Sequence, residues 1–85
     1  MKAKHSIYEI RYALQPEIAG ALNEVSTTLN VEILEINKEE EAYSIKGTFK
    51  VTPLFSTIVK RKGKFEAKLD ESLKIISLKI TEEEL

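Results

Sequence analysis

The chain has 85 residues, of which 42% are hydrophobic and 32% charged, and its formal net charge is −1. This length allows one folded domain, residues 1–85, and the near-neutral charge excludes a general attraction to nucleic acid. The chain has no cysteine and one histidine, His5, so it predicts no disulfide, no metal site and no cofactor. A domain this small without such a staple is expected to form a homo-oligomer.

The amino-terminal Met-Lys-Ala-Lys lacks the apolar run of a secretory signal. No segment approaches the roughly 20 consecutive apolar residues that span a bilayer. We therefore expect a cytoplasmic protein with no membrane partner.

A half-buried strand is predicted over residues 5–14, because apolar and polar side chains alternate there. Its apolar face consists of Tyr8, Ile10, Tyr12 and Leu14. Pro16 then suits the first turn of one short helix, near residues 16–22, which Asn23 would end.

Residues 25–36 are rich in β-branched side chains and predict a second strand. The alternation of Leu29, Val31 and Ile33 slips before Leu34, which indicates a bulge near Ile33. Residues 37–41 contain no large apolar side chain and are predicted to form a solvated hairpin turn.

The clearest strand covers residues 43–52, where ten side chains alternate strictly between an apolar and a polar face. Its apolar face consists of Tyr43, Ile45, Gly47, Phe49 and Val51. Pro53 cannot donate a ladder hydrogen bond, so strand pairing is expected to pause there and to resume over residues 54–59. Residues 60–64, with Gly63 among them, predict the next turn.

Phe65, Ala67 and Leu69 are expected to line a returning strand, with Glu66 and Lys68 facing water. The segment Leu73–Ile80 fits both a helical and a strand spacing, and its β-branched residues favour the strand. Residues 81–84 are expected to fray as an acidic end. The sequence thus predicts an α+β fold, mainly antiparallel β, with a four- to five-stranded sheet and one short helix or helical turn.

Catalytic machinery is not visible in the sequence. The serines lie in no Gly-x-Ser-x-Gly context and lack a base to activate them. The acidic runs 39–41 and 82–84 are typical of solvated charge, and the three glycines are too sparse for a phosphate-binding loop. We expect the protein not to be an enzyme.

One local cluster combines positive charge with an aromatic ring, as single-strand nucleic-acid binders do. It consists of Lys60, Arg61, Lys62, Lys64 and Phe65. The same residues also suit a basic hairpin turn or a strand edge protected by lysine, and this interpretation is favoured because a binding stripe usually raises the charge of the whole domain.

Several segments follow one another in an order that resembles a known fold. These are Ile7-Tyr8-Glu9-Ile10, Leu29-Asn30-Val31-Glu32-Ile33, the strand from Tyr43 to Val51, and Lys62-Gly63-Lys64-Phe65. Over residues 1–67 this order resembles the SecB-like chaperone fold, which implies binding of unfolded polypeptide. The two carboxy-terminal helices of that family have no counterpart, because Leu73–Ile80 stands in their place. A shorter likeness, to β-rich domains of spore-coat assembly proteins, is confined to residues 43–52.

The hypothesis from the sequence is a non-enzymatic protein-binding module, such as a chaperone-like or adaptor protein. It would bind a protein partner or an unfolded polypeptide through an apolar sheet face or a strand edge. The predicted contact residues are Tyr8, Ile10 and Tyr12. The alternative is a small nucleic-acid binder that uses the basic and aromatic cluster from Lys60 to Phe65.

Overall fold

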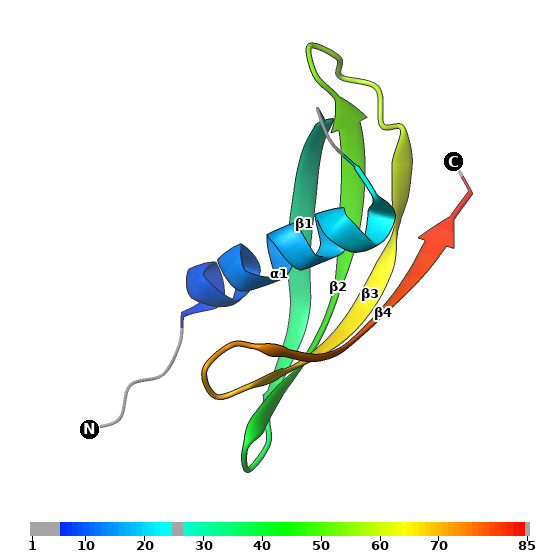
Figure 1. The fold of residues 1–85 in the computed structure, drawn as a ribbon. Coiled ribbons are helices and arrows are strands. Elements are labelled where there is room, and N and C mark those ends of the chain that lie inside the picture. The colour runs from blue at the N-terminus through cyan, green and yellow to red at the C-terminus, as the bar shows by residue number, and fades with distance from the viewer. Residues whose placement is uncertain (1–5, 25–26, 85) are drawn as a thin grey trace.

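One helix lies across a four-stranded antiparallel sheet in the computed structural model, which describes residues 6–24 and 27–84 (Figure 1). The elements in chain order are α1 (Ile7–Leu22), β1 (Thr27–Lys38), β2 (Ala42–Pro53), β3 (Arg61–Asp70) and β4 (Ile75–Glu83). The strands are ordered β1-β2-β3-β4, so each pairs with its neighbour along the chain, and β1 and β4 are the two edges. The predicted α+β class with a mainly antiparallel sheet is confirmed.

The amino-terminal segment corrects one prediction, because its described residues form the first half of α1 and not a strand. Ser6 begins the helix with a capping box: its hydroxyl accepts a hydrogen bond from Glu9 N at 3.1 Å, and the Glu9 carboxylate accepts one from Ser6 N at 2.9 Å. The side chains of Ile10 and Leu14 were assigned to one face of a strand, but a spacing of four also places them on one face of a helix. Residues 7–10, compared above with the first strand of the SecB-like fold, are therefore helical.

The predicted end of the helix is correct, whereas its predicted start is wrong. Asn23 adopts a left-handed conformation with φ 59° and donates its N–H to the carbonyls of Ala19 and Gly20. Pro16 lies inside the helix and has no N–H to donate to the Tyr12 carbonyl. Packing of the buried side chains against the sheet compensates for this loss. These side chains are Ile10, Leu14, Ile18 and Leu22.

Most of the strand predictions are confirmed. The register of β1 against β2 shifts between Ile33 and Glu35, where the bulge was expected. The predicted apolar faces of β2 and β3 are buried, and the ambiguous segment after Leu73 forms β4. Residues 81–83 belong to this strand and pair with β3, so the predicted fraying is wrong there.

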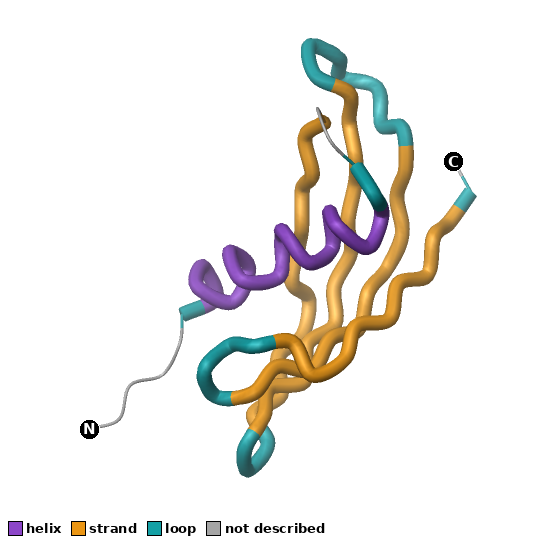
Figure 2. Tube along the Cα trace, viewed as in Figure 1, coloured by secondary structure: helices purple, strands orange, loops and turns teal. Residues whose placement is uncertain are grey.

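The segment between β2 and β3 differs from the prediction. Residues 54–60 form a loop where a strand was expected, and β3 already begins at Arg61, inside the predicted turn (Figure 2). Ser56 N donates to the Pro53 carbonyl at 3.2 Å and Lys60 N donates to the Val51 carbonyl at 2.7 Å. These two bonds form a turn at Pro53 and close the loop, which accounts for the missing strand.

Phe55 is strained at the tip of this loop. It is fully exposed and has φ 63°, a left-handed conformation that costs a non-glycine residue about 1–2 kcal/mol. Phe55→Gly is therefore expected to raise the free energy of unfolding by about 1 kcal/mol, because it removes the strain and loses no burial. Urea denaturation measures this change. Phe55→Ala keeps a Cβ in the strained conformation, so an equal gain in that variant would contradict the explanation.

Two phenylalanine rings cover two glycines in the centre of the sheet. Gly47 of β2 lies opposite Phe65 of β3, and Phe49 of β2 lies opposite Gly63 of β3. A Cβ on Gly47 would lie 2.7 Å from the Phe65 ring, and a Cβ on Gly63 would lie 2.8 Å from the Phe49 ring. Both rings are buried, so the glycines make the space in which the core packs.

Candidate functional site

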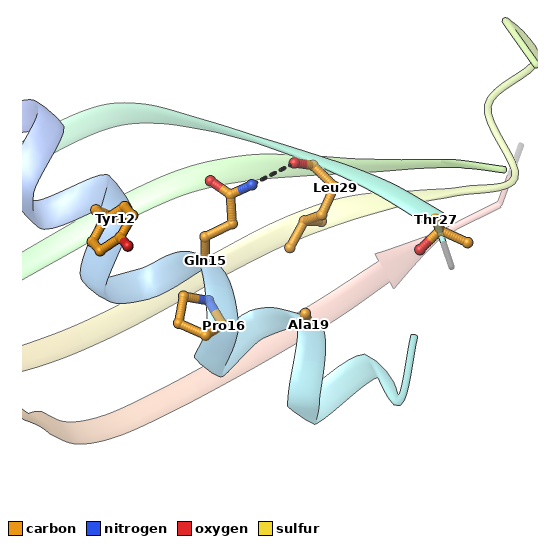
Figure 3. A pocket seen from close by; sticks show the side chains of 6 residues that line it. All are labelled: Tyr12, Gln15, Pro16, Ala19, Thr27 and Leu29. Carbon is orange, nitrogen blue, oxygen red and sulfur yellow. Dashed lines mark hydrogen bonds between the residues drawn. The ribbon is translucent and has the colours of Figure 1, made fainter. Parts of the chain in front are cut away.

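An open groove of about 510 Å³ lies between α1 and the edge strand β1 (Figure 3). Its walls come from one flank of the helix and from the first residues of the strand. The lining residues are Tyr12, Gln15, Pro16, Ala19, Thr27 and Leu29. Apolar groups make up much of this lining, so the groove offers contact area to an apolar side chain.

The spacing of the helix residues explains why this flank faces the edge strand. Successive residues of an α-helix are rotated by about 100°, so the flank next to the buried stripe carries Tyr8, Tyr12, Gln15 and Ala19. Gln15 donates its side-chain N–H to the Leu29 carbonyl at 2.8 Å, which fixes this flank against β1 (Figure 3). The groove therefore depends on the helix, and on its continuation through Pro16.

The outer edge of β1 has no strand beside it in the described sheet. Val51, the partner of Leu29 on β2, accepts a hydrogen bond from Lys60 N on its other side. Leu29 therefore directs its own carbonyl away from β2 and toward Gln15. In an antiparallel ladder every second residue directs its backbone groups to the same side, so Val31 and Ile33 share this outward orientation. The bulge after Ile33 then breaks the regular edge. Residues 27–33 thus form a short stretch of regular edge beside the groove.

Two of the three predicted contact residues are accessible. Tyr8 is 72% exposed and Tyr12 is 84% exposed, and they lie one helical turn apart on the groove side of α1. The Arg11 guanidinium lies 5.7 Å from the centre of the Tyr8 ring. Ile10 is only 1% exposed and belongs to the core, so it cannot contact a partner in this fold. The difference arises because these residues lie on a helix.

The predicted nucleic-acid cluster is not assembled as a stacking surface. Phe65 is 1% exposed in the core, so its ring cannot stack on a base. Lys60 and Arg61 pair with Glu24 at 3.4 and 2.6 Å, and Lys64 lies 3.8 Å from Glu83. Lys62 points to the face of β3 opposite Phe65. The cluster is divided because successive strand residues face opposite sides of the sheet.

Arg61 instead joins the end of the helix to the last strand. Its guanidinium donates to the Glu82 carboxylate through two N–H groups, each at 2.8 Å, and to the Leu22 carbonyl at 2.8 Å. The hydrogen bond from Arg61 lowers the pKa of Glu24 and that of Glu82, while the two carboxylates, Glu82 foremost, raise the pKa of Arg61. This arrangement is a structural ion-pair network, since each charge has its partner.

The face of the sheet opposite α1 is polar. Its side chains include Lys46, Lys50, Lys64 and Glu66, all exposed. The apolar face packs against α1, and the side chains at its centre are buried. Within residues 6–24 and 27–84, no three His, Cys, Asp or Glu residues lie together as metal ligands. Over the same residues, no helix has the length and apolarity needed to cross a membrane.

The sequence interpretation missed five groove residues as site residues, namely Gln15, Pro16, Ala19, Thr27 and Leu29. The signal that could have revealed them is the spacing of Ser6 and Glu9, which is typical of a capping box and would have extended the helix to the amino terminus. Comparison with protein-family models, curated proteins and solved structures gives no match. The geometry of the groove and edge is therefore the basis for a functional assignment.

Proposed function

We propose that the protein is a non-enzymatic protein-interaction module that takes an extended polypeptide as an additional strand along β1. The observation that carries this proposal is the position of the regular free edge of β1 directly beside the groove. Backbone groups on the edge provide hydrogen bonds to any sequence, and the groove accepts alternate side chains of the added strand.

The bond from Gln15 to Leu29 supports this chemistry. The Gln15 amide donates to an outward carbonyl of β1 at 2.8 Å, which is the bond that a backbone N–H of an added strand would make. The carbonyl has two lone pairs, so it can accept from Gln15 and from a strand at once. Tyr12 at the rim of the groove supplies an exposed aromatic ring next to this edge.

Tyr12→Ser is the variant that tests this proposal. A buried tyrosine contributes roughly 1.5–3 kcal/mol to an interface, so binding is expected to weaken about tenfold or more. The probe is a fluorescently labelled, reduced and carboxymethylated protein that stays unfolded, and anisotropy measures its affinity. Because Tyr12 is exposed in the free protein, its loss is expected to change the free energy of unfolding by less than about 0.5 kcal/mol.

Phe55→Ser is the matched control, since it removes another exposed aromatic ring from a loop outside the groove. It is expected to leave affinity for the unfolded probe unchanged. Equal weakening by both variants would contradict the assignment to the groove. Tight binding to a single-stranded oligonucleotide that falls steeply with salt, without binding to the unfolded probe, would favour the nucleic-acid alternative instead.

A further inference from the structure

We infer that a second copy of this chain occupies the edge and groove, through antiparallel pairing of two β1 strands about a two-fold axis. This inference rests on the proposed function, because it uses the same strand addition along β1, with β1 of a second copy as the added strand. Pairing of this kind joins the two sheets into one continuous sheet. The two-fold axis is perpendicular to that sheet, so both α1 helices lie on the same side of it.

The regular part of the edge selects the register. Leu29, Val31 and Ile33 direct their backbone groups outward, and the bulge ends the regular edge after Ile33. Centring the two-fold axis on Val31 uses all three residues. Val31 then pairs with Val31 of the second copy, and Leu29 pairs with Ile33 of the second copy.

Charge on the polar face agrees with this register. Asn30 lies opposite Glu32 of the second copy, so an amide meets a carboxylate at both ends of the pairing. Centring the axis on Glu32 would keep the same backbone groups facing the second copy, but it would place two glutamates directly opposite each other. The β1 edge is therefore complementary to its own copy when the axis lies on Val31, whereas an axis on Glu32 brings two negative charges together.

The same register covers the exposed flank of the helix. Ile33, which is only partly buried in one copy, would lie beside Leu29 of the other copy at the wall of the groove. The amino-terminal half of α1, which carries Tyr8 and Tyr12, projects past the edge of β1 (Figure 1), so in this pairing it would reach across the axis toward the second copy. The contact would therefore combine backbone pairing with burial of these aromatic rings.

A second copy fits this site better than an unrelated strand, because the pairing closes on itself. An isologous contact through β1 leaves no free β1 edge to recruit further chains. It also enlarges the core of a small chain that has no disulfide.

The test is a charge exchange across the axis. In Asn30→Glu, the new carboxylate of each copy would face Glu32 of the opposite copy, which makes two repulsive pairs, and the dimer is expected to dissociate about tenfold more readily. The fold is expected to persist, since residue 30 also lies opposite Lys50 in its own sheet. Adding Glu32→Lys to this variant places opposite charges across the axis and is expected to restore the dimer. Sedimentation equilibrium over a wide concentration range, with circular dichroism for folding, measures these changes.

The dimer and the proposed function can fail independently of each other. A monomeric wild-type protein, or a dimer that Asn30→Glu does not weaken, or a double variant that stays dissociated, would overturn the β1 dimer. The unfolded probe described above is then offered to the monomeric form. If the monomer binds the unfolded probe, the proposed function is supported, even where the dimer has been overturned. If the dimer is confirmed but its dissociated monomer does not bind the probe, only the proposed function is overturned.

Discussion

Gly47→Ala is expected to lower the free energy of unfolding by about 3 kcal/mol or more, and the melting temperature by roughly 10–20 °C. The added Cβ would collide with the Glu32 carbonyl of β1 and would lie 2.7 Å from the Phe65 ring. The carbonyl belongs to the neighbouring strand, so the collision cannot be relieved by rotating a side chain. Thermal unfolding followed by circular dichroism measures the loss.

Gly20→Ala is the control for this prediction. A Cβ at Gly20 would meet no atom within 4 Å, and Gly20 lies in the interior of α1. This variant is expected to gain about 0.5–1 kcal/mol, because alanine loses less conformational freedom in a helix. A small effect of Gly47→Ala, similar in size to that of Gly20→Ala, would show that the strand spacing around Gly47 is looser than the structure has it.

Arg61→Met is expected to lower the melting temperature at neutral pH by roughly 5 °C or more, since it removes the donor that three acceptors share and leaves Glu24 with Lys60 alone, at 3.4 Å. These acceptors are the Leu22 carbonyl and the carboxylates of Glu24 and Glu82. Without Arg61 the end of the helix also loses its link to β4. Thermal unfolding at pH 7 measures this loss.

The pH dependence of stability should change in the same variant. Arg61 lowers the pKa of Glu24 and of Glu82 in the folded state below the usual value of 4.5. This contribution is therefore present above the unfolded pKa and is lost as the pH falls through the lowered folded values. Wild-type stability should fall as the pH drops below about 4.5, and Arg61→Met should show a flatter acid limb.

Two comparisons make the acid prediction specific. Asp70, whose pKa is lowered by the backbone N–H of Lys74 and by Ser72, keeps its partners in Arg61→Met, so some acid sensitivity should remain. Lys64→Met removes an exposed contact to Glu83 at 3.8 Å and should change neither the melting temperature nor the acid limb appreciably. Parallel acid limbs in the wild type and Arg61→Met would contradict the role assigned to Arg61.

The two structural predictions and the proposed binding site involve different parts of the molecule. Gly47 acts in the centre of the sheet and Arg61 at the end of the helix, whereas Tyr12 and Asn30 lie beside the free edge of β1. A stability effect at the first two sites can therefore be separated from a binding effect at the others.

The sequence by itself determined where side chains alternate in the four strands, although residues 7–14 and 54–59, also predicted as strand, form a helix and a loop. A strand places alternate side chains on opposite faces, so the ten alternating residues from Tyr43 to Thr52 could be assigned without knowledge of their neighbours. The slip after Ile33 located the bulge for the same reason. Gly47 and Phe65 were assigned to their strands, although their pairing was not foreseen, because register depends on contacts between strands.

Only the tertiary structure decided the amino-terminal helix and the site beside it. The side chains of Tyr8, Ile10, Tyr12 and Leu14 satisfy a strand pattern and, through Ile10 and Leu14, a helical one. The segment forms a helix because Ser6 caps its first turn and because its apolar side chains bury the apolar face of the sheet, which no other element covers in the described chain. The groove brings Tyr12 next to Leu29, and a contact between residues so distant along the chain follows from packing and not from local pattern.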